Sequence, residues 1–522
     1  MNTITIFFKT VDKLSSQKLT IGLIVLAMLV ATQIQHIQHR WLNPDSVLYL
    51  ESAKLIAIGN WNAAFEIFNW PLYSALIALV HKLTSFNVHL SAQILNVVFF
   101  GVASASFIKI IQLAGGNNRT ILAGTLILLS SHYLVGDILQ MLLRDEGFWA
   151  FFLTSIVFFI RFYKSNHYLD AFLWQICAIM ATLFRIEAIT YLIFLPMSLF
   201  FYQQATFPQK LKQFLKCNFL SIIALIGIFT AVLLSDSLSM KSFGRLDEVF
   251  TLNIFNQLTY ELVTRSAIMS SQVLGRFLDE FAIPGLLMTF VYVLIVKSIS
   301  ATGIVNLGLA MLAIKSRKRL INNTVFYILS AVALIAFLNM ALIITKVFVL
   351  SSRYVLALSF VLMVFAAFYL ADSFRYFEQK SKPSKKTQWL IIALLAFMVL
   401  SLVKNMLPKQ NGYNYIQDAT TWIDQHKVPK KEVFYDDKRM RYYLGLPFIP
   451  DMGNDWLMVT SAIEDKSIQK YNYLLLSFSV KDKDREKLVA DKLSEYHEIK
   501  RFNSAKAKKS VVLYQRISSI TP

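Results

Sequence analysis

A small set of acidic and basic residues lies at the edges of long apolar segments, where an ionisable group is costly and is therefore a candidate functional group. The set consists of Asp45, Arg144, Asp145, Glu146, Arg185, Glu187 and Arg353. A carboxylate in such a position can take a proton from an attacking hydroxyl or amine. A guanidinium can bind two oxygens of a phosphate at once. Together, these residue types suit a reaction in which a base activates a nucleophile and cations stabilise an anionic leaving group.

Asp45 is the candidate for the base, and its neighbours leave two interpretations open. It follows Pro44 and precedes an amphipathic stretch, 47–58, so a helix is expected here. An Asp at that point can cap the helix by accepting hydrogen bonds from its first N–H groups. It can also act as a base, and the two roles can coexist. Tyr49 and Lys54 on the same stretch are candidates to support a site, although a surface position explains them equally well.

The candidate phosphate ligands are arginines that begin apolar segments. Arg144 and Arg353 each lie at such a start, where the positive end of the helix dipole disfavours a cation unless an anion is near. A phosphate would be one such anion, so each of them is a candidate phosphate ligand. Asp145 and Glu146 suit the same dipole without any substrate, so a structural role stays open for both.

Arg185 and Glu187 are two residues apart and would point to different faces of one continuous helix. A turn between two helices would instead bring them together as a plain ion pair, which stands beside an interpretation in which they bind substrate. His36 and His39 have the spacing of metal ligands. No third ligand accompanies them in the sequence, so no metal site is expected.

The composition indicates a multi-pass membrane protein. Of the 522 residues, 56% are hydrophobic and 16% are charged, and the mean hydropathy is +0.51, whereas about a quarter of a soluble protein's residues are charged. The net charge of +20 does not indicate nucleic-acid binding, because the Lys and Arg residues fall in alternate loops. That is the positive-inside pattern. It predicts a cytoplasmic N-terminus and places the candidate site residues on the outer side.

The same pattern predicts about eleven crossings. They lie at 19–35, 88–111, 120–136, 147–163, 168–184, 188–203, 217–235, 298–314, 324–345, 354–371 and 389–405. Two outer loops, 41–87 and 236–282, are long. The apolar segment 71–83 is too short to span a bilayer. The segment 281–296 is expected to be re-entrant or to lie at the surface, because a crossing there would put a basic loop outside.

From about Pro408 the composition becomes that of a soluble domain. We therefore expect an all-α membrane domain over 1–407 and a small extracytoplasmic α/β domain over 408–522. Strands are predicted at 432–435, 473–480, 498–502 and 510–515, and helices at 415–426 and 482–496. The alternation of strands and helices without hairpin signals favours a partly parallel sheet.

The order and sidedness of several short motifs resemble the membrane-embedded glycosyltransferases of the GT-C fold, which include protein O-mannosyltransferases and the aminoarabinose transferase of lipid A. The motifs, spread over most of the chain, are Asp45-Ser46 with Tyr49, Gly59-Asn60-Trp61, Trp70-Pro71-Leu72-Tyr73, Arg144-Asp145-Glu146, Phe184-Arg185-Ile186-Glu187, Ser352-Arg353-Tyr354 and Arg441-Tyr442-Tyr443-Leu444-Gly445. The mannosyltransferases have an Asp-Glu pair where this chain has Asp45-Ser46, which leaves the acceptor open.

The resemblance implies a bacterial inner-membrane enzyme that moves a sugar from a polyprenyl-phosphate carrier to a lipid, glycan or protein acceptor on the outer side, without a cofactor. It implies Asp45 as the catalytic residue. It implies substrate-binding roles for Tyr49, Lys54, Arg144, Asp145, Glu146, Arg185, Glu187, Arg353 and Tyr354. One alternative is a transporter or lipid flippase, although such proteins usually consist of inverted repeats, of which this sequence shows no sign. The other is a non-catalytic lipid-binding assembly protein.

Overall fold

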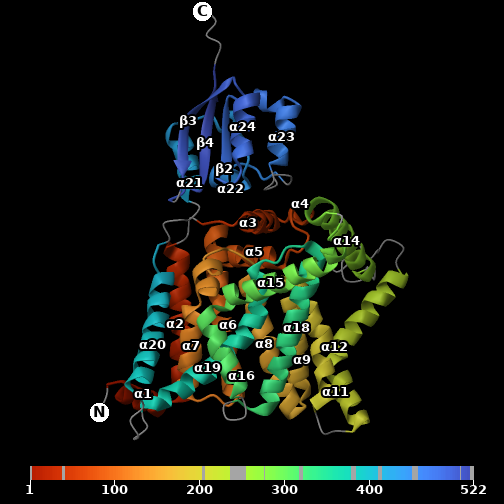
Figure 1. Ribbon diagram of the computed structural model, residues 1–522, viewed down its shortest axis with the longest axis vertical. Coiled ribbons are helices and arrows are strands. Elements are labelled where there is room, and N and C mark those ends of the chain that lie inside the picture. Colours follow the sequence, from red (N-terminus) through yellow and green to blue (C-terminus); the bar gives the residue numbers. More distant parts are fainter. Residues whose placement is uncertain are drawn as a thin grey trace, which may run out of the picture. The chain divides into compact units, whose positions relative to one another are not determined.

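The computed structural model describes residues 3–37, 41–202, 206–234, 254–275, 277–316, 321–377, 384–408, 414–449, 456–505 and 507–517. The chain forms two compact units (Figure 1). The first, which we call the helical unit, comprises Met1–Ile34, Ile94–Leu139 and Arg144–Met406. The second, which we call the mixed unit, comprises Gln35–Gln93, Gln140–Leu143 and Leu407–Pro522.

The helical unit is built from α-helices joined by short turns. Its helices are α1 (Thr3–Lys13), α2 (Ser16–Ile37), α6 (Val88–Leu113), α7 (Asn118–Ser130), α8 (Asp145–Ser165), α9 (Tyr168–Phe184), α10 (Ile189–Phe194), α11 (Leu199–Tyr202), α12 (Phe207–Leu234), α14 (Ile254–Met269), α15 (Ala282–Thr302), α16 (Ile304–Lys315), α18 (Asn323–Val347), α19 (Leu356–Ser373) and α20 (Lys385–Asn405). Short 3-10 turns are η2 (Ile186–Ala188), η3 (Leu195–Ser198), η6 (Asp279–Phe281), η7 (Ser352–Val355) and η8 (Phe374–Phe377), and η1 (His132–Ile138) and η5 (Ser270–Leu274) are π-helical.

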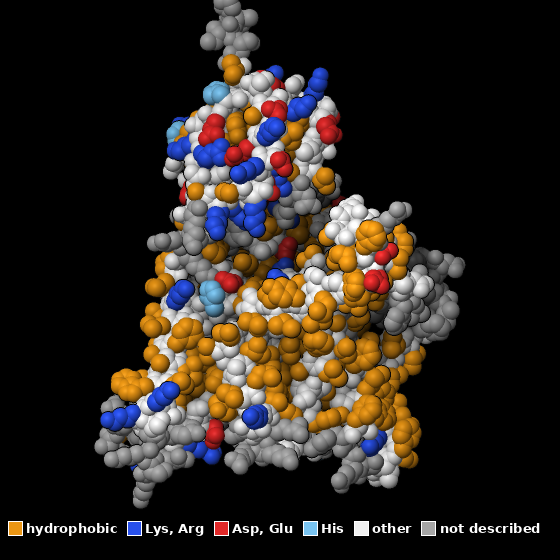
Figure 2. All heavy atoms as spheres, in the orientation of Figure 1, with side chains coloured by type: hydrophobic (Ala, Val, Ile, Leu, Met, Phe, Trp, Pro, Cys, Tyr) orange, Lys and Arg blue, Asp and Glu red, His pale blue; other side chains and the backbone are white. Residues whose placement is uncertain are grey.

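Many of these helices are long and apolar enough to cross a bilayer. Among the described residues there are 7 of them, at Ser16–Ile37, Val88–Leu113, Asp145–Ser165, Asp279–Thr302, Asn323–Val347, Ser352–Ser373 and Lys385–Asn405. Counting α7 and η1 as one bent span makes up to 8. On the face shown in Figure 2, hydrophobic side chains cover most of the surface of the helical unit. Such a surface needs lipid around it, so the chain is a multi-pass membrane protein.

Most of the expected crossings coincide with helices of the structure. Those at 19–35, 88–111, 147–163, 324–345, 354–371 and 389–405 each match one of the long apolar helices, and those at 168–184 and 217–235 match α9 and the second half of α12. The short segment 71–83 is also helical. The total of eleven crossings stays a prediction. Residues 236–253 of the expected outer loop 236–282 lie outside the described residues.

The prediction of one continuous helix is wrong for three of the expected crossings, because each of them is interrupted. The segment 120–136 bends by 47° after α7, because Asn405 donates hydrogen bonds to the carbonyls of Leu129 (3.4 Å) and Ser131 (3.3 Å) in place of the helical ones. The segment 188–203 is broken at Pro196, which cannot donate a helical hydrogen bond. The segment 298–314 is divided between α15 and α16 at Gly303, whose φ of +84° ends the first helix.

In the mixed unit, the first loop forms three helices. They are α3 (Pro44–Ala57), α4 (Trp61–Ile67) and α5 (Leu72–Thr84). The helix expected from residue 47 to 58 is therefore present. Helices α4 and α5 both pack on α3, and so does α22 (Lys438–Tyr443) from the C-terminal part of the chain. The helix that carries Asp45 thus lies between its own loop and the C-terminal domain.

The C-terminal part is an α/β sandwich around one sheet (Figure 1). Its strands are β1 (Val433–Tyr435), β2 (Tyr473–Ser479), β3 (Tyr496–Asn503) and β4 (Lys509–Arg516), in the order β1-β2-β4-β3, and its other helices are α21 (Asn414–Gln425), α23 (Leu457–Glu464) and α24 (Lys483–Lys492) with the 3-10 turns η9 (Lys430–Glu432) and η10 (Ser467–Lys470). Alternate residues of a strand face opposite sides. Leu474 and Leu476 accordingly pack with α23 and α24, whereas Leu475 packs with α21 and α22.

The predicted sheet is confirmed in its strands and only in part in its connections. Strands β1 and β2 are parallel, as expected, while β2 with β4 and β3 with β4 are antiparallel. The expectation that hairpins are absent is wrong, because β3 and β4 form one. The helix expected at 482–496 stops at Lys492, since Tyr496 already begins β3.

Candidate functional site

A buried ion cluster in the helical unit contains four of the expected site residues, Asp145, Arg185, Glu187 and Arg353. Arg185, which follows α9, forms an ion pair with Asp145 at the start of α8, and their side chains are only 7% and 2% exposed. The Arg185 Nε also lies 3.5 Å from Glu187 Oε2. The expected ion pair of Arg185 with Glu187 is therefore present. The more buried partner is Asp145, which lies 40 positions away in the chain, so local spacing could not reveal it.

Arg353 interacts with the same carboxylate from a third element. It belongs to η7, and its NH1 lies 3.7 Å from Asp145 Oδ2. This distance is an ion pair but not a hydrogen bond. Asp145 is thus an anion of the kind that the helix dipole requires near a cation at this end of α19. The side chain of Arg353 is 26% exposed, so its guanidinium is reachable from outside the cluster, unlike that of Arg185.

Aromatic rings complete the surroundings of Arg185. Its guanidinium carbon lies 4.5 Å from the ring centre of Tyr354 and 5.9 Å from that of Phe148, close enough for cation–π attraction. Two carboxylates and two rings therefore surround one buried guanidinium. This arrangement favours a structural role for Arg185 and Tyr354, in which they join α8, α9 and η7 next to Arg353.

Next to this cluster, α8 begins with two further expected site residues. Arg144 occupies the capping position, and its side chain is half-buried. Glu146 is fully buried, and neither of its carboxylate oxygens has a hydrogen-bond partner among the described residues. A buried carboxylate without donors reduces stability. Such a group in a folded protein is often retained for a function.

Tyr133 is a candidate site residue that sequence reasoning missed. It lies in the π-helix η1, and its hydroxyl contacts Ser351 and Ser352 within electrostatic range of Arg353. π-helical turns are frequent at functional sites. The local sequence carries no signal for one, because the bend depends on Asn405, far away in the chain.

Two apolar grooves flank the broken helix that follows the cluster. The larger, of about 540 Å³, lies between α10, η3 and α18 and includes Leu338 and Asn339 in its lining. Asn339 donates hydrogen bonds to the carbonyl of Glu187 (3.2 Å) and to Thr190 Oγ1 (2.6 Å), which ties this end of the groove to the ion cluster. The smaller, of about 410 Å³, lies between α9, α10 and α12, and Met197 lines both grooves.

In the mixed unit, Asp45 is the second residue of α3 and does not cap it. Asn43 Oδ1 accepts a hydrogen bond from the N–H of Asp45 (2.9 Å), and Ser46 Oγ accepts one from the N–H of Asn43 (3.2 Å). The interpretation of Asp45 as the cap is wrong, because Pro44 takes the first helical position and moves the cap back to Asn43. The half-buried carboxylate of Asp45 is thus not needed to close the end of the helix.

Tyr49 and Lys54 lie on α3 with different surroundings. The ring of Tyr49 is buried against Phe68 and Tyr73, with ring centres 5.1 and 5.3 Å away, so it joins α3 to α5. The Nζ of Lys54 lies 2.7 Å from Glu51 Oε1 and 4.6 Å from the ring centre of Tyr442 in α22. Lys54 is therefore on the surface that the C-terminal domain contacts.

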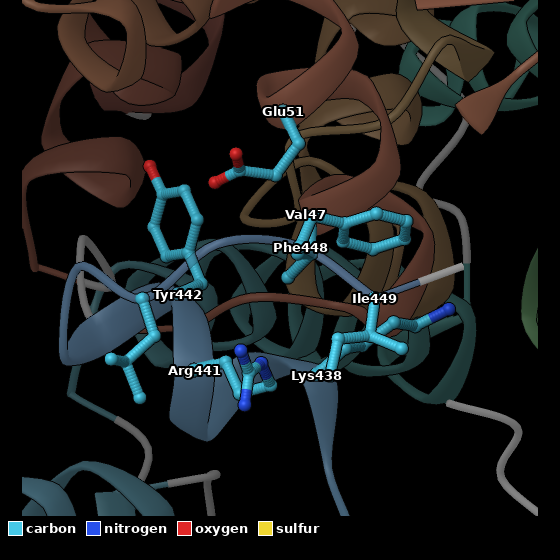
Figure 3. Close-up of a pocket in the computed structure, with 8 residues that line it drawn as sticks. Val47, Glu51, Lys438, Arg441, Tyr442, Phe448 and Ile449 are labelled. Carbon is cyan, nitrogen blue, oxygen red and sulfur yellow. The ribbon is translucent and has the colours of Figure 1, made fainter. Parts of the chain in front are cut away.

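Figure 3 shows the small cavity between α3 and the C-terminal domain. It is lined by Val47, Glu51, Lys438, Arg441, Tyr442, Leu446, Phe448 and Ile449. The Glu51 carboxylate and the Tyr442 hydroxyl point toward one another in this view. The charge of Lys438 acts on Asp45. Lys438 was not among the expected site residues, because nothing in the sequence links it to a helix some 390 residues earlier.

Comparisons with known proteins identify the fold. No protein-family model and no curated protein sequence matches the chain. Among solved structures, ArnT from Cupriavidus metallidurans bound to undecaprenyl phosphate is similar with a TM-score of 0.51 and 11% identity, over 96% of this chain and 98% of that one. The archaeal oligosaccharyltransferase AglB from Archaeoglobus fulgidus, in complex with an inhibitory peptide and a dolichol-phosphate, gives a TM-score of 0.47 and 13% identity, over 84% of this chain and 60% of that one.

The similarity to ArnT extends over nearly the whole length of both chains, so it includes the helical unit and the mixed unit alike. Identity this low establishes the architecture and not the activity. The chain has the GT-C fold.

Proposed function

We propose that the chain is an integral-membrane glycosyltransferase that moves a sugar from a polyprenyl-phosphate carrier to an acceptor on the outer side of the membrane. The observation that carries the proposal is the ion cluster beside an apolar groove in the helical unit. A reachable cation, Arg353, is joined through Asp145, Arg185 and Glu187 to Asn339 at one end of that groove. A phosphate attached to a long apolar chain needs both features together.

The bound lipids of the two similar structures support this class of donor. ArnT carries undecaprenyl phosphate and AglB carries a dolichol-phosphate. Both ligands are phosphates on polyprenyl chains. An identity of 11% does not by itself indicate the same substrate. The groove and the arginines of the present chain are therefore the grounds for proposing this class of donor.

The proposed reaction is a direct displacement. Asp45 takes the proton of the acceptor hydroxyl or amine, and the acceptor atom forms a bond to the anomeric carbon of the sugar. The bond between that carbon and the phosphate oxygen breaks, and the electron pair leaves with the phosphate. Arg353 and Arg144 stabilise the negative charge that develops on it. Asp145, Arg185, Glu187 and Tyr354 hold Arg353 in place, and Tyr49 and Lys54 hold α3.

The decisive experiment replaces Asp45 by Asn in the purified protein, reconstituted with labelled polyprenyl-phosphate sugars and a membrane extract as the source of acceptor. Asn keeps the size and removes the base, so transfer is expected to fall by about 10²–10⁴-fold while donor binding is retained. Glu66→Gln, which neutralises an exposed carboxylate on the same loop, is the matched control and should transfer normally.

Transfer by the Asp45→Asn variant at the parental rate would remove the base from the mechanism. Wild-type protein that binds the labelled lipid and moves it across the bilayer without consuming it would indicate a lipid transporter instead of a transferase.

A further inference from the structure

The N-terminal helix α1 is fixed to the ends of other helices of the helical unit. The ring of Phe8 stacks on that of Phe374, which follows α19, with ring centres 4.4 Å apart. Arg119 of α7 donates from Nε to both carboxylate oxygens of Asp12, at 3.0 Å each. The neighbouring Asn118 donates hydrogen bonds to two backbone carbonyls, in the last part of α1 and in the turn after it, at 3.0 and 2.8 Å. These contacts give α1 a defined place beside the beginning of α7 and the end of α19.

Helix α1 lies at the boundary of the apolar spans. Only Leu14 and Ser15 separate it from α2, which is long and apolar enough to cross a bilayer. Gln112, near the end of α6, donates hydrogen bonds to Ser16 Oγ (3.4 Å) and Thr20 Oγ1 (3.1 Å), so that span ends at the same level. Spans of this kind end where the hydrocarbon core gives way to the lipid headgroups. The helices that meet around α1 therefore place it at the bilayer surface (Figure 1).

One side of α1 and of the turn after it is apolar and exposed. Ile6, Phe7 and Leu14, which we call the apolar face, are 49%, 52% and 44% exposed. Phe8 and Val11, which face the protein, are buried. The described part of the chain thus leaves about half of each side chain of the apolar face uncovered. Exposed apolar side chains gathered next to a membrane span are suited to contact with lipid.

Three lysines accompany the apolar face without using their charge inside the protein. Lys9 and Lys13 are four positions apart in α1 and therefore share one side of it, and Lys18 lies in the first turn of α2. All three are exposed, and none has an ion pair or a hydrogen bond within the part of the chain that the structure describes. Asp12, the single acid of α1, already pairs with Arg119. The positive charge of this surface is thus left for an anionic partner.

We propose that this surface binds anionic lipids, with the apolar face among the acyl chains and the three lysines at the headgroups. A helix that lies in the bilayer surface combines an apolar side with a cationic side in this way. The bilayer is the partner because α1 is nearly continuous with the span α2, so lipid already surrounds its end. The inference concerns the lipid around the protein and does not depend on the sugar-transfer reaction.

The test measures which lipids lie next to α1. Phe7→Cys, with Cys177 and Cys217 replaced by Ala, is labelled with the fluorophore NBD in the full-length protein, in nanodiscs of phosphatidylcholine and phosphatidylglycerol. A nitroxide quencher is carried on the acyl chain of one lipid or of the other, at equal mole fraction. Quenching by both lipids is expected, because the label lies among the acyl chains. Phosphatidylglycerol should quench more strongly, with a local concentration about fivefold higher for each lysine at a headgroup.

Replacing Lys9, Lys13 and Lys18 together by Gln should remove the preference for phosphatidylglycerol and leave quenching by phosphatidylcholine in place. The same label at Lys483→Cys, on the exposed side of α24, is the control and should be quenched by neither lipid. An unquenched label at position 7 would refute the insertion of the apolar face. Equal quenching by the two lipids with the lysines present, or a preference that survives their replacement, would refute the anionic-lipid site.

Discussion

Arg185 and Arg353 both interact with the carboxylate of Asp145, but their surroundings differ. The surroundings of Arg185 suit a structural role, whereas those of Arg353 suit phosphate binding. Arg185 is 7% exposed and is surrounded by Asp145, Glu187 and two rings, whereas Arg353 is 26% exposed and lies farther from Asp145. An arginine enclosed by two acids already has its anions. An arginine on the rim of the same cluster can bind a phosphate without dismantling it.

Replacing Arg353 by Ala is therefore expected to slow sugar transfer by about 10²–10³-fold, equivalent to about 3–4 kcal/mol, if the contact is made mainly as the phosphate leaves. Arg353→Lys should lie between wild type and Arg353→Ala, because it keeps the charge and loses the forked geometry. The same series at Arg144 should behave alike. The measurement is kcat/KM for the lipid-phosphate donor, with thermal unfolding in detergent as the control for folding. Normal turnover in both Ala variants would exclude phosphate binding by these two residues.

For single residues, the sequence indicates which residues belong to the candidate site better than it indicates which residues they contact. The spacing of Arg185 and Glu187 allowed their ion pair to be predicted, because the two residues are neighbours in the chain. It could not reveal that Asp145 joins Arg185 to Arg353, since that depends on how α8, α9 and η7 pack. The position of Asp45 after Pro44 allowed it to be interpreted as the helix cap. The hydrogen bonds of Asn43 show instead that Asn43, two residues earlier, caps the helix.

The groove beside α18 gives a prediction about an element. Leu338 lines it and is 51% exposed, so a larger side chain there would occupy the space for an apolar chain. Leu338→Trp is expected to lower kcat/KM about tenfold for a donor with a long polyprenyl chain, because each buried methylene group contributes about 0.8 kcal/mol. A donor with a single short prenyl chain should be affected much less.

Leu400→Trp is the control for this substitution. Leu400 is 66% exposed on α20 and lines neither groove. Equal losses for long and short donors in Leu338→Trp, or equal effects of the two Trp variants on the long donor, would mean that the groove does not hold the carrier chain.

A carboxyl group directly after β1 should make the stability of the C-terminal domain depend on pH. Asp436 accepts hydrogen bonds from the Ser477 N–H (2.6 Å) and Trp456 Nε1 (3.1 Å), but burial nevertheless raises its pKa to about 7. Between about pH 4 and 7 the folded domain therefore binds a proton that the unfolded chain releases. The free energy of unfolding of this domain should decrease as the pH rises through that range.

The measurement is denaturant unfolding of the full-length protein at pH 5 and pH 8, followed by the fluorescence of Trp456 in a variant whose seven other tryptophans are replaced by Phe. Asp436→Asn should remove the part of the pH dependence that belongs to this group. An unchanged slope in that variant would show that Asp436 is ionised over the whole range. Lys483→Met, which changes an exposed charge of the same domain, should leave the slope as it is.

The sequence allowed the helices and strands to be predicted, but not the places where expected helices are interrupted. Apolar length predicted most of the membrane helices, and β-branched and aromatic content predicted all four strands. The bend after Ser130, the break at Pro196 and the division at Gly303 interrupt segments whose composition alone suggests one helix. The bend in particular requires Asn405 from another helix, so no local pattern could indicate it.

At the scale of the whole molecule, the distribution of Lys and Arg leads to a test of orientation. With Cys177 and Cys217 replaced by Ala, single cysteines are introduced at Lys385, which begins α20, and at Ala505, between β3 and β4. An impermeant thiol reagent applied to intact cells should label only the cysteine at 505, because the basic loop before α20 is expected in the cytoplasm. Labelling at 385 instead of 505 would invert the topology and move Asp45 to the cytoplasmic side.

The composition of the mixed unit also has a consequence for how the protein is made. Its segments Gln35–Gln93 and Leu407–Pro522 are separated by roughly 300 residues. At about 5–20 residues per second, the ribosome needs on the order of 15–60 s between the end of one and the start of the other. During that interval α3 has been synthesised, but the α22 on which it packs does not yet exist. A nascent chain therefore passes through a long period in which Val47 and Lys54 are present and their C-terminal neighbours are missing. Chaperones and proteases that bind the chain in this interval can therefore act on it before α3 and α22 have packed together.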